Sequence, residues 1–104
     1  LNLLNNAYEH FLEREIKNPR IDIQTKDNEE FIEISISDNA GGISNEIIEK
    51  IFDPYFSTKF AKNGNGLGLY MSKLIIEEHL EGELSVINEN EGAKFIIKLK
   101  ALHD

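Results

Sequence analysis

The sequence predicts an α/β (α+β) two-layer sandwich, with a mixed, mostly antiparallel sheet covered on one face by about three helices. Four short segments alternate apolar and polar residues, as strands with one buried face do. Three other segments repeat apolar residues every three or four positions, which is typical of amphipathic helices. Because the strands alternate cleanly, one face of the sheet is expected to pack against the helices while the other meets solvent.

The first helical pattern covers residues 1–17 and ends before Pro19, since the residue preceding a proline is pushed out of the α region. Its apolar positions are Leu4, Ala7, Tyr8, Phe11, Leu12 and Ile16. The helix opens with three asparagines although Asn is a poor helix former. Asn2 and Asn6 are four residues apart and therefore share a face. Their amides are either solvated at a frayed terminus or directed at a ligand or a hard cation.

Two strands are expected next, over residues 21–23 and 32–36, joined by a polar turn. The second strand runs into the turn cluster of residues 38–42, where Asp38 alone can be read as an Asx-turn residue or as a binding residue. A short helix, capped by Ser44 or Asn45, is expected to follow up to Ile51. Two further strands, at residues 84–86 and 95–99, complete the sheet.

A glycine-rich stretch separates the two halves of the chain. Glycines 64, 66 and 68 run into a helical pattern that continues to about Leu80 and stops at Gly82, with Tyr70 and Met71 expected in the core. Such a turn directs backbone N–H groups and the positive end of a helix dipole at one point, which suits phosphate. Residues 53–66 hold one Asp and two Lys, so they carry +1 in a chain of net charge −8. The spacing matches neither the dinucleotide fingerprint nor the P-loop, so the stretch alone is either a phosphate loop or a flexible surface loop.

The composition limits the class of protein. A chain of 104 residues is expected to form a single domain over residues 1–104, and its start inside a helical pattern suggests a domain truncated at its N-terminus. The acidic balance argues against nucleic acid or an anionic membrane surface as partners. The chain has no cysteine for disulfides or thiolate metal sites. Apolar runs approaching ~20 residues are missing, so direct membrane contact by this fragment is not expected.

Four blocks, in this order, carry a resemblance to a known family. They are NLLNNA at residues 2–7, DNAGGI at 38–43, FDPYFSTK at 52–59 and GNGLGL at 64–69. With these blocks the chain resembles the ATP-binding catalytic domain of sensor histidine kinases, which belongs with gyrase, heat-shock chaperones and mismatch-repair proteins to an ATPase superfamily of Bergerat-type fold. The block at 52–59, the F box, points to histidine kinases rather than to the other members.

The resemblance implies a role for each block. Asn6 would bind the Mg²⁺ that bridges the ATP phosphates, supported by Asn2, and Lys59 would reach the phosphates; these three are the catalytic candidates. Asp38 would accept a hydrogen bond from the adenine amino group, and Gly42 would let the backbone pass close to the base. The other implied ATP-binding residues are Ile43, Tyr55, Phe56, Gly64, Asn65, Gly66, Leu67, Gly68, Leu69 and Ala93.

Some positions leave alternatives open or depart from the family pattern. Tyr55 and Phe56 either order the segment above the phosphates and meet the phosphoacceptor domain, or only pack within that segment. Ala40 stands where the family usually has the first glycine of its box, which restricts the turn unless φ is negative there. Ala93 stands where a threonine often lies beneath the base, so one hydroxyl contact is lost.

The implied reaction is transfer of the ATP γ-phosphoryl group to a histidine on a separate helical dimerisation and phosphoacceptor domain, and then to a response regulator. The domain would be cytoplasmic, in a parent protein that can be anchored in the inner membrane. His10, His79 and His103 lack the sequence setting of the family's acceptor and are expected to be surface residues. One alternative is a catalytically silent nucleotide-binding module. Another is an ATP-hydrolysing clamp, but Asn2 occupies the position of that group's glutamate base, and an amide cannot take a proton from water.

Overall fold

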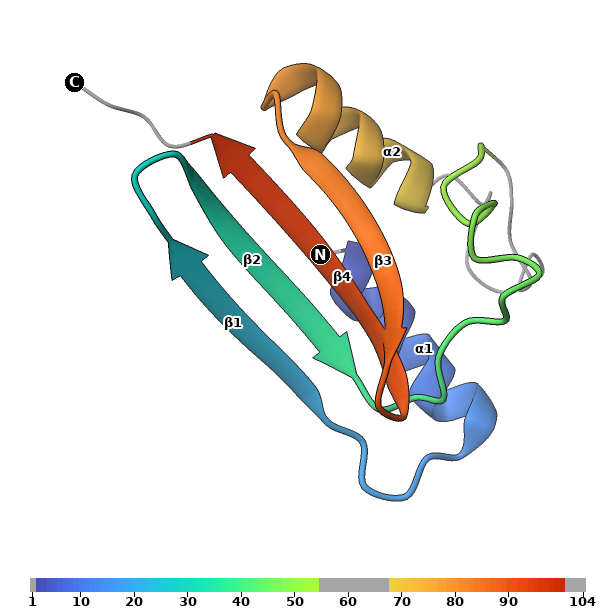
Figure 1. Cartoon of the computed structure of the whole chain (residues 1–104). Helices are drawn as coiled ribbons and strands as arrows, with labels where there is room; N and C mark the ends of the chain where they lie inside the picture. Colours follow the sequence, from blue (N-terminus) through green and yellow to red (C-terminus); the bar gives the residue numbers. More distant parts are fainter. Residues whose placement is uncertain (1, 55–67, 101–104) are drawn as a thin grey trace.

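The computed structural model describes residues 2–54 and 68–100, and for Asn2, Asn5 and Asn6 the description extends to the backbone. Helix α1 (Asn2–Arg14) is followed by strands β1 (Ile21–Asp27) and β2 (Phe31–Asp38). Helix α2 (Gly68–Leu74) continues directly as a π-helical turn, η1 (Ile75–His79), and strands β3 (Glu83–Glu89) and β4 (Gly92–Lys100) close the chain. The two helices lie on the same side of the sheet, as Figure 1 shows. The two-layer α+β prediction is therefore confirmed.

The four strands form one sheet in the order β1-β2-β4-β3, and every pair among the described strands is antiparallel. The register places Ile23, Ile36, Phe95 and Val86 in one row across the sheet. The neighbouring row of Asp22, Ser37 and Lys94 lies on the opposite face because side chains alternate along a strand. The alternation in the sequence therefore separates the core face from the solvent face, as expected.

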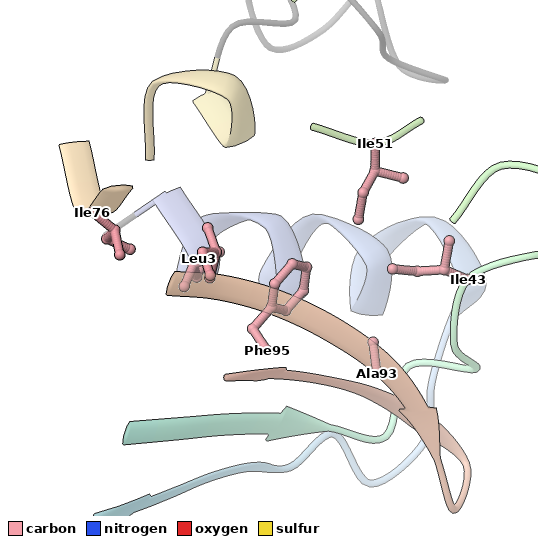
Figure 2. Packing of buried hydrophobic residues seen from close by; sticks show 7 residues of the cluster. Leu3, Ile43, Ile51, Ile76, Ala93 and Phe95 are labelled. Carbon is pink, nitrogen blue, oxygen red and sulfur yellow. The ribbon is translucent and has the colours of Figure 1, made fainter. Parts of the chain in front are cut away.

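The core lies between this sheet and α1, with α2 beside it (Figure 2). Its buried members come from six separate segments of the chain and are Leu3, Ile43, Ile51, Ile76, Leu84, Ala93 and Phe95. A smaller cluster joins α1 to the end of β2 through Ala7, Phe11 and Ala40, with Ile16 and Ile21 packed against it. The helical cover does not extend over β1, where Ile23 stays 56% exposed.

Helix α1 differs from the expected one in its end and in its buried face. It ends at Arg14 because Glu15 adopts φ 51° and the Ile16 N–H donates to the Phe11 carbonyl at 3.2 Å, which is a Schellman arrangement. The buried stripe is Leu3, Ala7 and Phe11. Tyr8 and Leu12, two of the apolar positions of the predicted helix, are 59% and 61% exposed, since they lie about 100° around the helix from that stripe.

The short helix expected up to Ile51 is not a helix. Residues 45–52 form consecutive turns, in which the N–H groups of Ile47 and Ile48 donate to the Ser44 carbonyl and that of Lys50 donates to Ile47. Buried Ile43 and Ile51 nevertheless contribute their side chains to the core. Packing of these isoleucines is satisfied without a regular helical ladder, so the described residues contain two helical segments rather than three.

The segment after α2 keeps the helical direction but widens. The Leu80 N–H donates to the Ile75 carbonyl five residues earlier, at 3.1 Å, and the residue with positive φ at its end is Glu81 (φ 55°). Gly82 is required for a different reason than the expected helix stop, because a Cβ there would lie 2.3 Å from the Lys98 carbonyl oxygen. The core prediction for Met71 is wrong, since this residue is 41% exposed. No helix in residues 2–54 and 68–100 has the length and apolarity needed to cross a membrane.

Candidate functional site

The Asp38 carboxylate ends β2 and is held in one orientation by two backbone groups. Its Oδ1 accepts from the N–H of Ala40 at 3.0 Å and from the N–H of Ala93 on β4 at 3.3 Å. The first of these is the Asx-turn bond expected from the sequence. The second joins Asp38 to a residue 55 positions later. Within the described residues no donor reaches Oδ2, so one oxygen positions the half-buried side chain and the other is left to accept.

The turn after Asp38 depends on two glycines. Gly41 and Gly42 have φ of 101° and 80°, which an L side chain rarely adopts. The Gly41 N–H donates to the Glu91 carbonyl at 2.8 Å, and this bond fixes the turn against the β3–β4 connection. Ala40 is only 1% exposed and is not among the residues with positive φ. The departure at Ala40 therefore leaves the turn unrestricted, and its methyl group packs against α1.

Two residues that the sequence analysis did not single out hold this turn from both sides. Arg14 Nη1 donates to the carbonyls of Ala40 at 2.6 Å and Gly42 at 2.9 Å. The Asn88 amide pairs with both backbone groups of Ile43, accepting at 2.8 Å and donating at 2.7 Å. In the sequence, Arg14 is a basic residue in the last turn of a helix, and Asn88 stands beside the end of a strand. Both features are common, so no sequence signal distinguishes them.

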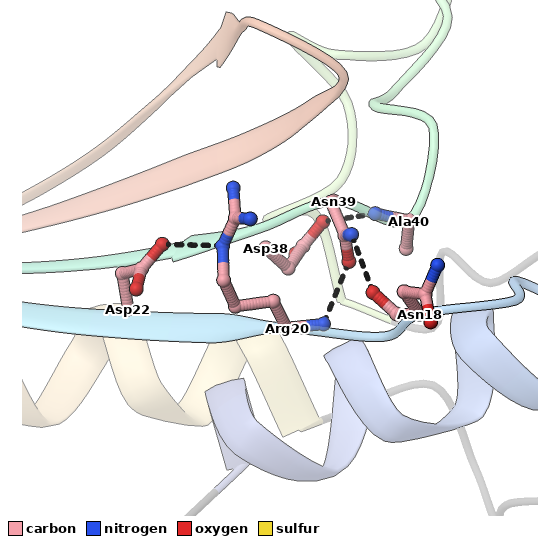
Figure 3. Close-up of polar contacts among 6 residues, drawn as sticks. All are labelled: Asn18, Arg20, Asp22, Asp38, Asn39 and Ala40. Atoms are coloured by element: carbon pink, nitrogen blue, oxygen red, sulfur yellow. Dashed lines mark hydrogen bonds and ion pairs between the residues drawn. The ribbon is translucent and has the colours of Figure 1, made fainter.

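Asn39 supports the same end of the sheet on the side of β1 (Figure 3). Its Oδ1 accepts from the Arg20 N–H at 2.8 Å, and its Nδ2 donates to the Asn18 carbonyl at 2.8 Å. The Arg20 guanidinium in turn contacts Asp22 at 3.0 Å. The segment leading into β1 is thereby fastened to the residue that follows Asp38.

Close backbone packing completes the surroundings of Asp38. A Cβ at Gly92 would lie 1.6 Å from the Asp38 carbonyl oxygen, so only glycine fits at the start of β4. Ala93 is 4% exposed and packs in the main core. The structure thus brings together Asp38, Gly42, Ile43 and Ala93, four of the expected ATP-binding residues.

The other expected residues are placed only in part. Asn2 and Asn6 lie in α1, next to the buried Leu3 and Ala7, but their side chains are outside the description. Gly68 is the exposed first residue of α2, and Leu69 packs against the main core. The following fall outside the described residues: Tyr55, Phe56, Lys59, Gly64, Asn65, Gly66 and Leu67. Helices α1 and α2 contact each other, so residues 2–7 of α1 and residues 68–69 of α2 lie together on the helical side of the sheet.

A polar hollow begins at Asp38 and extends over the face of the sheet opposite the helices. It has a volume of about 580 Å³ and is lined by Arg20, Asp22, Gln24, Ser37, Asp38, Asn39, Glu89, Asn90, Glu91 and Lys94. Its cations are already paired, Arg20 with Asp22 at 3.0 Å and Lys94 with Glu89 at 3.6 Å. Asp38 and Asn39 place one end of this hollow at the candidate site, whereas its strand residues lie on the sheet face opposite the helices.

Comparison with known proteins agrees with this arrangement. The family described as "Histidine kinase-, DNA gyrase B-, and HSP90-like ATPase" matches residues 1–103. The sensor histidine kinase GlnK of Bacillus subtilis is 36% identical over 98% of the chain. A putative NtrY-like sensor histidine kinase of Rickettsia prowazekii is 38% identical over 99% of the chain.

A solved structure of the catalytic domain of the histidine kinase ThkA, free of nucleotide, superposes on 95% of the chain with a TM-score of 0.78 and 33% identity. The chain covers 62% of that ThkA chain, 25% of GlnK and 17% of the NtrY-like protein. The chain belongs to the histidine kinase-, gyrase B- and HSP90-like ATPase family. Its sequence and fold are those of the ATP-binding catalytic domain of a sensor histidine kinase.

Proposed function

We propose that this domain binds ATP with Mg²⁺ and transfers the γ-phosphoryl group to a histidine on a separate helical dimerisation and phosphoacceptor domain, from which a response regulator receives it. The observation that supports this most is the Asp38 carboxylate, with one oxygen committed to two backbone N–H groups and the other left to accept. It lies beside a glycine turn whose backbone is fixed from both sides.

The base-binding end follows from the chemistry of Asp38. An ionised carboxylate can only accept hydrogen bonds. Adenine offers an amino group at the position where guanine has a carbonyl oxygen, so Oδ2 can pair with adenine and would face an acceptor on guanine. The Ala93 N–H is already donated to Asp38 and its side chain packs in the main core, so Ala93 supports Asp38 rather than offering a polar contact to the base.

The phosphate end would be formed by α1 and by the glycine block of residues 64–69. Asn6, with Asn2 one helical turn away, would hold Mg²⁺ through an amide oxygen, a hard donor of the kind this ion takes. Bound Mg²⁺ would neutralise charge that develops on the phosphate oxygens. The chain's own residues act by positioning, as phosphoryl transfer generally requires. Lys59, Tyr55 and Phe56 are proposed to contact the phosphates and the acceptor domain.

The choice of base tests this proposal. Losing a hydrogen bond to a charged group costs roughly 1.5–3 kcal/mol, and each ~1.4 kcal/mol is tenfold in affinity. GTP should therefore bind at least about tenfold more weakly than ATP in competition against a fluorescent ATP analogue. Asp38→Ala should weaken the binding of ATP strongly and that of GTP little, so the difference between the two affinities should become smaller.

A control substitution at Asp27, at the far end of β1, should leave both affinities unchanged. Equal binding of ATP and GTP by the wild-type domain would return Asp38 to a purely structural role. ATP binding without phosphoryl transfer to an added phosphoacceptor domain would identify the silent nucleotide-binding module instead.

A further inference from the structure

Strand β3 forms the edge of the sheet next to α2. The backbone N–H and carbonyl of Leu84 in this strand form hydrogen bonds with side chains rather than with a further strand. Lys73 Nζ donates to the Leu84 carbonyl at 3.2 Å, while Glu77 Oε2 accepts from the Leu84 N–H at 3.4 Å. Lys73 and Glu77 also pair with each other at 2.9 Å. Together they provide the donor and the acceptor that a neighbouring strand would offer, so the helical segment is fastened to β3 at Leu84.

The same ammonium group also contacts the segment on the other side of the glycine-rich stretch. Lys73 Nζ lies 5.0 Å from the centroid of the Phe52 ring. Phe52 packs edge-on against Phe95 of β4, with centroids 6.2 Å apart and planes at 84°. Phe52 begins the F box, whereas Lys73 lies five residues after Gly68. Lys73 therefore belongs to the helix that follows residues 55–67 and contacts Phe52, which precedes them.

This arrangement is more than a solvated ion pair between adjacent helical turns. The hydrogen bond from Lys73 is the main cause that lowers the pKa of Glu77. Both side chains remain about one-third exposed, and an exposed pair of this kind contributes little stability by itself. Its distinctive feature is geometric, because three partners from three segments converge on one cation: Glu77, the Leu84 carbonyl and the Phe52 ring.

We propose that Lys73 is a positioning residue for nucleotide binding. It sets the place of α2, which begins at Gly68 and Leu69, relative to Phe52 and to the edge of β3. This inference rests on the proposed ATP binding, and it assigns Lys73 to the phosphate end of the ligand only. The Asp38 end of the site has its own supports in Arg14 and Asn88 and should not depend on Lys73.

The test compares ATP with adenosine, which lacks phosphates. Lys73→Met keeps an unbranched apolar stem over Phe52 but removes the charge. It should weaken Mg²⁺–ATP binding by roughly three- to tenfold, the range for residues that act through others, and leave adenosine binding within error. Lys73→Arg should restore most of the ATP affinity, since it keeps the cation and its donors.

Lys98→Met is the matched control, because Lys98 Nζ lies 4.8 Å from the Phe31 ring at a site away from α2. It should change neither affinity. The proposal is overturned if Lys73→Met binds ATP as wild type does, or if ATP and adenosine affinities fall together with the thermal midpoint. Failure of the wild-type domain to bind ATP would instead overturn the proposed function.

Discussion

The two carboxylate oxygens of Asp38 differ in their contacts. Oδ1 accepts from Ala40 and from Ala93, so it closes the local turn and joins β2 to β4 at once. A charged acceptor with two backbone donors is well oriented, and this orientation leaves Oδ2 available. The turn role of Asp38 is therefore compatible with the binding role proposed for it, because the turn bond positions the other oxygen.

The asparagines of α1 allow a prediction at the same scale. Asn6→Ala should weaken ATP binding by about tenfold or more when Mg²⁺ is present, because the amide oxygen would be a ligand of the ion. Calorimetric titration with Mg²⁺ and with excess chelator measures both conditions. Asn5→Ala, one residue away and on another face of the helix, is the control and should bind normally. An equal loss with and without Mg²⁺ would exclude a metal-ligand role for Asn6.

At the scale of elements, the turn of residues 38–43 is held by three parts of the fold at once. Arg14 reaches it from the end of α1, Asn88 from the end of β3, and the Glu91 carbonyl from the β3–β4 connection. Each contact uses backbone groups of the turn. The contacts can form because Gly41 and Gly42 carry no side chain that would block Arg14 or Asn88. The turn is therefore a rigid support for Asp38 although it has no regular secondary structure.

A double-mutant cycle tests this rigidity. Gly42→Ala should lower the free energy of unfolding by about 1–2 kcal/mol for the positive φ alone. It should lower it further because the new Cβ would lie 2.8 Å from Asn88 Oδ1. In an Asn88→Ala background the clash disappears while the backbone cost remains. Urea denaturation of the four proteins measures the coupling. Additive effects would mean that Asn88 does not pack against Gly42 in solution.

At the scale of the whole molecule, helices cover the middle and one edge of the sheet and leave the other edge open. Residues 2–7 of α1 and residues 68–69 of α2 lie on the covered side, where Ala40 of the turn after Asp38 packs against α1. Two histidines lie in the described residues: His79 is exposed at the end of η1, and His10 is half-buried in α1. No histidine has the sequence setting of a phosphoacceptor, which agrees with an acceptor on a separate domain.

The 104-residue chain should consequently not label itself. Incubation with ATP radiolabelled at the γ-phosphate should leave no covalent phosphate on the protein, whereas a suitable helical acceptor domain added in trans should become labelled. Stability of the product in base and loss in acid identify phosphohistidine. His79→Ala serves as a control for the exposed histidine. Label on the chain alone that this substitution removes would contradict the assignment of the acceptor to another domain.

Much of the fold was predictable because strand alternation is a local property of the chain. The four strands, the position of α1 and the start of the helix after the glycines follow from such patterns, and Asp38 was found because its block is contiguous. The short helix before Phe52 and the core position of Met71 were predicted wrongly. Periodicity shows that a segment has an apolar stripe, but not which of two adjacent stripes meets the sheet, nor whether isoleucines need a helix to reach the core.

The sequence by itself therefore determined the strand pattern, the identity of the blocks and the class of ligand, all of which are carried by neighbouring residues. Only the tertiary structure decided the strand order β1-β2-β4-β3, and with it the contacts between residues far apart in the chain. That order makes β3 an edge, which allows Lys73 and Glu77 to pair with Leu84, and puts Asn88 within reach of Ile43. The physical reason is that such contacts depend on which strands pair and which surfaces pack, and no local pattern of polarity encodes either one.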